Sequence, residues 1–239
     1  MSLVYKRVLL KLSGEALKAD EKGLFHYETV DAICEAIGKC RAAGTQVAVV
    51  VGAGNIWRGG RADRKMDRSL ADHMGMLGTT INALCLKDTL VQMGIPAVVM
   101  TAVEMRTFAL PYVKDDAVKL LEEGTVVIFG CGTGSPYFST DTAAVLRGKE
   151  IGADALLFAK NIDGIYTADP KKDRTAVKLS HITFKRILSE QLKAIDLTAA
   201  AFCLENDMKV LVFGLDDPEN IVKIAMGEQQ PGTVIDNEE

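Results

Sequence analysis

A junction that recurs five times along the chain constrains the fold more than any other feature. At each one a helix-like segment ends and an apolar, often β-branched run begins at once: RAAGTQVAVVVG, VQMGIPAVVM, LEEGTVVIFG, EIGADALLFA and ENDMKVLVFG. A left-handed residue commonly ends a helix, and four junctions carry a glycine at that place: Gly44, Gly94, Gly124 and Gly152. In the fifth, Asn206 and Asp207 can adopt that conformation. The runs are continuous rather than alternating, which predicts strands buried on both faces.

Helical patterns separate these runs, at 28–42, 68–92, 112–123, 141–151, 198–207 and 218–226. With KRVLLKLS as the first strand, the order of elements predicts an α/β fold with a mostly parallel sheet and helices on both faces. The crossovers are then expected to be right-handed. Residues 161–197 are rich in Asp, Lys and Thr, and we interpret them as a long excursion within one domain that covers 1–239.

Composition excludes several classes of protein. The net charge of −4 argues against general nucleic-acid binding, which needs a basic surface. The five cysteines form no CxxC pair, and none of the three histidines lies near one at a zinc-like spacing, so we expect reduced thiols in the cytoplasm. The apolar run near the start is short and contains Lys11, so neither a signal peptide nor a membrane span is expected there.

Glycines and basic residues gather directly after the predicted strands, in KLSGEAL, VGAGNIWRGG, GCGTGSPYFSTDT and KNIDGIYTADP. Ligands of open parallel sheets bind beyond the carboxyl ends of the strands, where helix N-termini also converge. Lys11, Arg58 and Lys160 bring positive charge to that edge, which predicts a polyphosphate site. The chain has no GxxxxGK[ST] motif, and Trp57 replaces the third glycine of GxGxxG, so neither common nucleotide signature fits.

Two charged residues stand at positions where a charge is energetically unfavourable unless it has a partner. Lys11 lies inside an apolar strand, where an unpaired ammonium group is unfavourable; it either reaches solvent at the strand end or neutralises phosphate. Asp141 opens a predicted helix and stabilises its first turn, yet a carboxylate beside a phosphate would repel it unless it orients cations. A Lys11–Asp141 pair would satisfy both residues. His73, in ADHMGML, is expected to be a capped or core histidine.

Taken together, the loops resemble those of the bacterial uridylate (UMP) kinases of the amino acid kinase family. The resemblance extends from KRVLLKLSGEAL through GNIWRG, ADHMGMLGTTINAL and GTGSPYFSTDTAAVLRGKEIGADALLFAKNIDGIYTADP to KAIDLTAAAFCLEN. It implies a three-layer α/β/α sandwich, a homohexamer, and the reaction of ATP with UMP to give ADP and UDP in pyrimidine nucleotide biosynthesis. It also implies activation by GTP and inhibition by UTP; Lys87 and Arg106 are candidates for the effector response.

The resemblance also implies roles for individual residues, with Lys11, Arg58 and Asp141 as the catalytic set. The ATP-binding residues would be Lys11, Leu12, Ser13, Gly14, Gly54, Arg58, Lys160, Asn161, Tyr166 and Asp169. The UMP-binding residues would be Ala53, Asp72, Thr133, Gly134, Ser135, Pro136, Tyr137, Phe138, Ser139 and Thr140. Magnesium would be carried by the nucleotide, with Asp196 as an outer partner and no protein metal site.

One position departs from the pattern, because the family usually shows glycine where this chain has Ala53. Alanine can serve there if its φ is negative, and a positive φ would put the loop geometry in doubt. Two other functions stay open: an acetylglutamate-, aspartate- or carbamate-type kinase of the same fold, or a nucleotide-binding sensor without turnover. Tyr137 and Phe138 suit a flat base better than an aliphatic amino acid, which favours the UMP kinase.

Overall fold

The computed structural model describes residues 4–19, 23–57, 66–168, 170, 172–192, 195–228 and 231–238. Within them a nine-stranded sheet has the order β4-β3-β5-β2-β1-β6-β10-β11-β9. The first seven strands in that order are parallel, β11 pairs antiparallel with β10, and β9 pairs parallel with β11. The strands are β1 Arg7–Leu12, β2 Gln46–Val51, β3 Ala97–Thr101, β4 Leu110–Pro111, β5 Val126–Gly130, β6 Ala155–Lys160, β9 His181–Thr183, β10 Val210–Gly214 and β11 Thr233–Asp236. A separate hairpin joins β7 Ile165–Tyr166 to β8 Lys178–Leu179.

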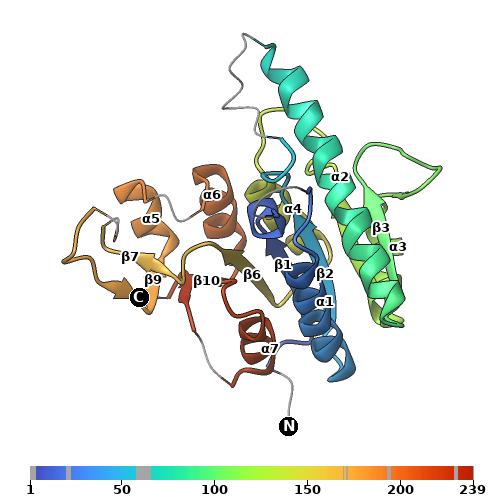
Figure 1. The fold of residues 1–239 in the computed structure, drawn as a ribbon. Helices are drawn as coiled ribbons and strands as arrows, with labels where there is room; N and C mark the ends of the chain where they lie inside the picture. Colours follow the sequence, from blue (N-terminus) through green and yellow to red (C-terminus); the bar gives the residue numbers. More distant parts are fainter. Residues whose placement is uncertain are drawn as a thin grey trace.

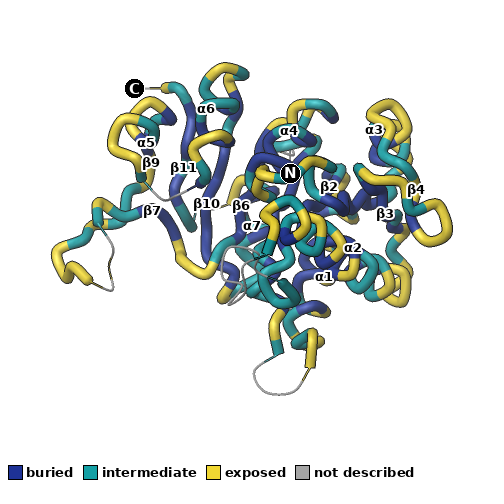
Figure 2. Tube along the Cα trace, turned by 90° about the horizontal axis from the view of Figure 1, so that it is seen from above, coloured by how far each residue is buried: buried dark blue, intermediate teal, exposed yellow. Residues whose placement is uncertain are grey.

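Helices cover both faces of this sheet (Figure 1). The described helices are the short 3-10 turn η1 Gly14–Leu17, α1 Tyr27–Ala42, α2 Arg68–Gln92, α3 Lys114–Glu122, α4 Thr140–Glu150, α5 Phe184–Glu190, α6 Leu197–Asn206 and α7 Glu219–Met226. Figure 2 shows α1, α2 and α7 on one side of the strands and α3 to α6 on the other, with the buried strands between them. The architecture is therefore the three-layer α/β/α sandwich that was expected.

Two hydrophobic clusters fill the spaces between the layers. Leu10 of β1 belongs to the cluster under α1, α2 and α7, with Leu86 of α2. Its neighbour Leu9 belongs to the cluster under the other helices, with Val145 of α4. Adjacent residues of one strand thus point into different clusters, because side chains alternate across a sheet. This explains why the central strands read as continuous apolar runs.

The predicted junctions are confirmed. All five apolar runs are strands, and each of the six helical ranges agrees with an observed helix to within two residues. The four glycines have φ of +99°, +75°, +78° and +65° in chain order, and Asp207 ends α6 with φ +51°. Helix α5 and strands β9 and β11 were not predicted. They are short and two of them lie in the polar 161–197 segment, where no periodic pattern is long enough to indicate them.

Burial determines the chemistry of most of the cysteine thiols. All five cysteines are free, and burial raises the pKa of Cys34, Cys40 and Cys203 to about 12. These three thiols therefore behave as small apolar side chains rather than as nucleophiles. Across the described part of the chain, every helix is too short or too polar to cross a bilayer.

Gly94 offers a direct test of the helix-stop interpretation. Its φ is +75°, and a Cβ added there would meet nothing within 4 Å, so a substitution changes only the backbone energetics. Gly94→Ala is expected to lower the free energy of unfolding by about 1 kcal/mol, because a Cβ disfavours the left-handed region. Gly94→Asn should cost less, since asparagine tolerates that region. Urea denaturation measures both, and an alanine variant as stable as the parent would contradict the interpretation.

Candidate active site

The carboxyl ends of β5, β2, β1 and β6 lie side by side at one edge of the sheet. Lys11 of β1 is in register with Val50 of β2 and with Phe158 of β6, and Val50 is in register with Phe129 of β5. The four loops that follow these strands are therefore neighbours in space, although the first begins at residue 13 and the last at residue 161. The predicted convergence of these loops at one edge of the sheet is therefore confirmed, while the polyphosphate site itself stays a prediction.

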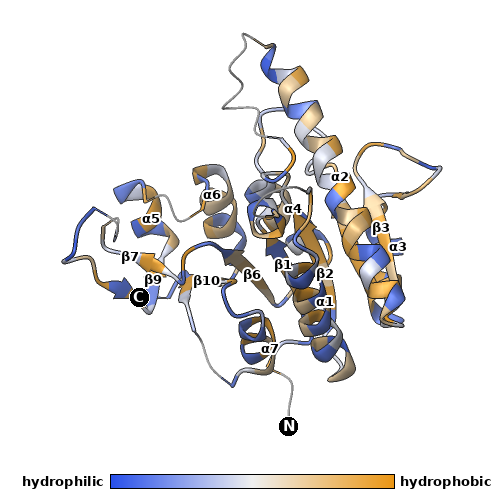
Figure 3. Cartoon of the chain, viewed as in Figure 1, coloured by the Kyte–Doolittle hydropathy of each residue, from blue (hydrophilic) through white to orange (hydrophobic). Residues whose placement is uncertain are grey.

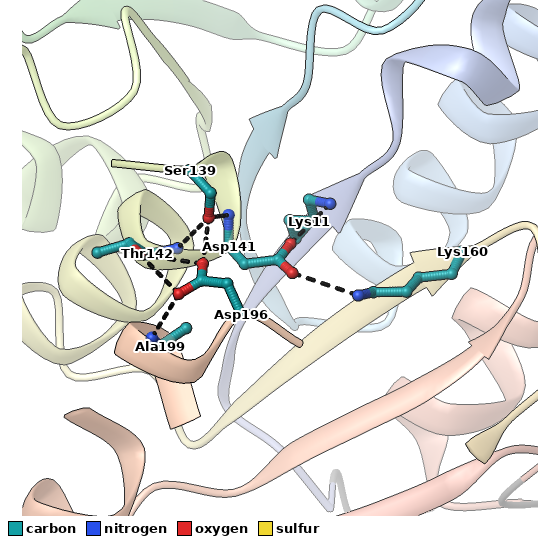
Figure 4. A network of polar contacts seen from close by, with 7 residues as sticks. All are labelled: Lys11, Ser139, Asp141, Thr142, Lys160, Asp196 and Ala199. Carbon is teal, nitrogen blue, oxygen red and sulfur yellow. Dashed lines mark hydrogen bonds and ion pairs between the residues drawn. The ribbon is translucent and has the colours of Figure 1, made fainter. Parts of the chain in front are cut away.

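At this edge Asp141 forms ion pairs with two lysines (Figure 4). Its Oδ1 lies 2.8 Å from Lys11 Nζ, and its Oδ2 lies 3.2 Å from Lys160 Nζ. Both ammonium groups also lie over the ring of Phe158, at 5.9 and 5.8 Å from its centroid. The predicted Lys11–Asp141 pair is confirmed. The second cation of Asp141 in the described residues is Lys160, whereas Arg58, the other cation of the expected catalytic set, lies outside them.

The charges of this triad are set by burial and by one another. Burial alone would raise the pKa of Asp141, but Lys11 and then Lys160 outweigh it, so that pKa is lowered. Burial lowers the pKa of Lys160 by more than the attraction of Asp141 raises it, and Lys11 lowers it further. With both lysines protonated, two positive charges face one negative charge. The carboxylate of Asp196 also raises the pKa of Lys160, and an anionic ligand at this edge would approach both ammonium groups.

A second network holds Asp141 in position from behind (Figure 4). Ser139 is the N-cap of α4, and its Oγ accepts hydrogen bonds from the backbone N–H of Asp141 at 3.0 Å and of Thr142 at 3.2 Å. The same hydroxyl donates to Asp196, which also accepts from Thr142 Oγ1 at 3.0 Å and caps α6 through the Ala199 N–H at 2.8 Å. Asp196 therefore joins the starts of α4 and α6, a link the sequence analysis missed. Asp196, directly before Leu197 at the start of α6, was an available N-cap signal.

The loops after β1 and β2 touch backbone to backbone. The Gly52 N–H donates to the Leu12 carbonyl at 2.9 Å. A Cβ added to Gly14 would lie 2.4 Å from the Gly52 oxygen and 2.6 Å from the Gly54 nitrogen. Only glycine fits at position 14, because both obstacles are backbone atoms that no side-chain movement can relieve. Two of the predicted phosphate loops are thereby combined into one surface.

Ala53 is compatible with this surface. The non-glycine residues with positive φ in the described ranges are Cys131, Tyr137, Gln191 and Asp207, so Ala53 meets the condition set from the sequence. Its methyl group lies where α2 carries Gly78, and a Cβ at Gly78 would come within 2.9 Å of it. Helix α2 thus leaves room for the alanine side chain.

A small cleft of about 120 Å³ lies between α2 and the turn after β5. Seven of the predicted UMP-binding residues line it: Ala53, Asp72, Thr133, Ser135, Phe138, Ser139 and Thr140. Gly134, Pro136 and Tyr137 belong to the same turn but not to its lining. Tyr137 is exposed, and the guanidinium carbon of Arg68 lies 5.7 Å from the centroid of its ring. The backbone N–H of Tyr137 donates a hydrogen bond to Asp72 Oδ2 at 2.8 Å. Asp72 therefore ties the turn to α2.

A larger cleft of about 640 Å³ lies beyond the ends of β6 and β10. It is lined by Ala16, Thr29, Lys160, Asn161, Ile162, Asp163, Tyr166, Pro170, Leu215 and Asp216. Three of the predicted ATP-binding residues are among them, whereas Asp169 lies outside the described residues. The sequence analysis missed Leu215 and Asp216. They directly follow the fifth apolar run, and the reasoning applied to the other strand ends would have found them.

Histidine takes no part in either cleft lining as described. His73 is exposed on α2, so the expectation of a capped or core histidine was wrong. Its position on the outer side of the helix could not be distinguished from a buried one, because the apolar pattern around it is nearly continuous.

Replacing Asp141 tests the triad. Asp141→Asn removes the carboxylate that pairs with Lys11 and with Lys160 and should lower the free energy of unfolding at pH 7 by about 3 kcal/mol. Without Asp141, the folded-state pKa of Lys160 lies even further below its unfolded-state pKa. At any pH between these two pKa values the unfolded chain binds more protons than the folded one. The variant should therefore regain stability as pH rises toward 10.5.

In the parent protein the lowered pKa of Asp141 gives a dependence of the same sign in a different pH range, because the contribution of the ion pairs is fully present above about pH 4 and is lost as pH falls below it. Glu190→Gln, which breaks the exposed Arg186–Glu190 pair on α5, is the control and should cost less than about 0.5 kcal/mol. Urea denaturation at pH 7 and pH 9 measures all three proteins. Equal losses for the two variants would show that the triad is not a coupled buried unit.

Several proteins of known structure are similar to this chain in fold and in sequence over nearly their whole length. The model of the amino acid kinase family matches residues 6–214. A crystal structure of UMP kinase from Bacillus anthracis is similar, with 34% identity over 98% of this chain and 97% of that one and a TM-score of 0.94. UMP kinase from Ureaplasma parvum is 35% identical over 97% of this chain and 99% of that one, with a TM-score of 0.91. Uridylate kinase from Archaeoglobus fulgidus is 29% identical over 95% of this chain and 99% of that one, with a TM-score of 0.74. The chain belongs to the amino acid kinase family.

Proposed function

We propose that the chain is a UMP kinase, which transfers the γ-phosphoryl group of ATP to UMP and releases ADP and UDP for pyrimidine nucleotide biosynthesis. The observation that carries this proposal is the position of the Lys11–Asp141–Lys160 triad between two clefts. Lys160 lines the larger cleft, and Thr140, the residue before Asp141, lines the smaller one. The 34% identity to the Bacillus anthracis UMP kinase over 98% of the chain supports the choice of substrates.

The larger cleft is proposed to take the adenosine end of ATP. Asn161 and Tyr166 line it, and its volume of about 640 Å³ accommodates a nucleoside. Asp169 joins this set by its place in the sequence. The phosphate chain would then extend toward the surface formed by Lys11 to Gly14 with Gly54, which Arg58 follows in the chain. Backbone N–H groups of such loops bind phosphate oxygens directly.

The smaller cleft is proposed to take UMP. Asp72 would accept a hydrogen bond from the ribose, and the turn from Thr133 to Thr140 would enclose the base and the phosphate. Ala53 contributes the wall opposite this turn. In this arrangement the acceptor phosphate and the γ-phosphate meet at the triad, which lies between the two clefts.

Phosphoryl transfer requires two anions to approach in line while their repulsion is neutralised. Lys11 and Arg58 would stabilise the charge on the transferred group, and Asp141 would orient the ammonium group of Lys11 through the 2.8 Å ion pair. A phosphate monoester has its second pKa near 6 and is anionic at pH 7, so no general base is needed. The absence of histidine from the described cleft linings agrees with this mechanism.

Magnesium is proposed to accompany the nucleotide. Among the described residues no three His, Cys, Asp or Glu side chains converge into a metal cage. Both oxygens of Asp141 and both oxygens of Asp196 already accept from protein donors. This donor set fits an ion held mainly by phosphates, with Asp196 as an outer contact, because Mg²⁺ commonly keeps several waters and binds substrate phosphates. When bound, the ion would neutralise phosphate charge.

The assembly and regulation are proposed from the resemblance, with one supporting observation. Leu70, Leu77 and Ile81 are exposed at seven- and four-residue spacings on α2, and hydrophobic residues continue along this helix in Figure 3. Such a stripe on a long helix fits a contact with a second copy of the chain. From the resemblance and this stripe together, we propose a cytoplasmic homohexamer of single-domain subunits, activated by GTP and inhibited by UTP.

The assembly can be tested by sedimentation velocity at micromolar concentration. The measured mass should be that of six chains, and a monomer would contradict the proposed hexamer.

The experiment that tests the function compares acceptors. ADP release from ATP is followed in a coupled assay with UMP, CMP or N-acetylglutamate as the acceptor, with and without GTP or UTP. UMP should support the fastest turnover. Turnover with acetylglutamate alone would identify the other kinase of this fold, and no acceptor-dependent release would favour a sensor. Either result would overturn the proposal.

Substitutions at the two ends of the reaction should have different kinetic signatures. Lys11→Met and Arg58→Ala should lower kcat roughly 100-fold, because they remove charge stabilisation at the transferred group, and should change the KM for UMP little. Asp72→Ala should raise the KM for UMP roughly 10-fold or more, because a charge-assisted hydrogen bond is lost. Asp115→Ala, an exposed carboxylate on α3, is the control. Steady-state kinetics showing the reverse pattern would contradict the assignment of the two ends.

A further inference from the structure

Asn82 lies fully buried in the middle of α2, with none of its surface exposed. A buried amide is costly unless all its hydrogen-bonding groups have partners, and asparagine is a poor helix former. An apolar side chain would suit this position better if it served only to pack the helix on the sheet. The residue is therefore explained by its polar contacts.

Those contacts all go to the loop after β2. Asn82 Nδ2 donates to the Gly52 carbonyl at 2.6 Å and to Asn55 Oδ1 at 2.8 Å. Asn55 Nδ2 donates in return to Asn82 Oδ1 at 3.0 Å. Both N–H groups and the oxygen of Asn82 are thus satisfied. The opposite orientation of the amide would place its oxygen against the Gly52 carbonyl, so the contacts themselves define the orientation.

The Gly52 contact determines the direction of a peptide group. In a trans peptide the carbonyl and the following N–H point in opposite directions, so holding the Gly52 oxygen against α2 turns the Ala53 N–H away from α2. The Gly52 N–H is held at the same time by the Leu12 carbonyl at 2.9 Å. Gly52 is thereby bound on both sides, next to Gly14 of the first phosphate loop.

The same helix supports the turn after β5. Thr79, nearly one turn before Asn82, accepts a hydrogen bond from the Cys131 N–H at 2.9 Å, where Cys131 has φ +63°. Two turns earlier, Asp72 accepts from the Tyr137 N–H at 2.8 Å. One side of α2 therefore holds both anion-binding turns, and a rigid helix positions a site more accurately than its loops could alone.

We infer that Asn82 is a positioning residue for phosphoryl transfer, which acts by fixing the Gly52–Asn55 loop against α2. The kinetic consequence rests on the proposed UMP kinase function. Because displacement of a site by about 1 Å can cost roughly 100-fold in rate, loss of this anchor should lower kcat by at least about 10-fold. The KM for ATP should change much less, since the adenosine cleft is lined by other elements.

The test compares three variants. Asn82→Ala removes the anchor, and Asn55→Ala removes the reciprocal amide pair from the half-buried side, where folding is less at risk. Leu90→Ala is the matched control, because Leu90 is equally buried on α2 two turns beyond Asn82 and packs in the hydrophobic cluster. Hydrogen exchange of the peptide covering 52–57 is measured without ligand, and kcat and KM are measured at a temperature where each variant is folded.

The two asparagine variants should exchange at least about 10-fold faster in 52–57, where the Ile56 and Trp57 N–H groups bond to the Ala53 carbonyl in the parent protein. Leu90→Ala should not. Unchanged exchange in both asparagine variants, or the same increase in Leu90→Ala, would overturn the inference. Hydrogen exchange needs no activity, so it decides the anchoring role even if the acceptor assay rejects the UMP kinase. A faster-exchanging loop with kcat unchanged would overturn the kinetic part alone.

Discussion

The site depends on the burial of one carboxylate between two ammonium groups. Asp141 lies between Lys11 and Lys160 and forms an ion pair with each of them at the end of a buried sheet. Both ammonium groups lie at the sheet edge from which the loops after β1 and β2 start. The helix cap at Ser139 and the carboxylate of Asp196 hold the first turn of α4, so the position of Asp141 does not rely on the ion pairs alone.

Helix α2 extends this support to the loops. Gly14 and Gly52 approach so closely that the loops after β1 and β2 form a single backbone surface. Asn82 binds that surface from behind, and Thr79 binds the turn after β5. Both proposed substrates would therefore meet groups whose positions come from one long helix. This is an arrangement in which small displacements of the helix would affect both ends of the reaction.

Much of this could be predicted from local signals in the sequence. Glycines at helix ends and continuous apolar runs identified the parallel strands, and the rule that ligands bind beyond strand ends indicated the edge that carries the candidate site. The same signals are weak where elements are short. Helix α5 has seven residues and β9 has three, so neither shows a periodic pattern long enough to be recognised. Asn82 was overlooked for a related reason, because its role depends on contacts 27 and 30 residues away rather than on its neighbours.

The sequence by itself determined the class of fold, the edge that carries the loops, and the need for a partner to Lys11. Only the tertiary structure decided which groups meet at that edge. Strand β1 lies between β2 and β6, and this order places Lys160 within 3.2 Å of Asp141 although the two belong to different elements. The order of strands arises from the packing of both helical layers on the whole sheet, and no local pattern encodes it. The second cation of the triad could therefore be identified only in the folded chain.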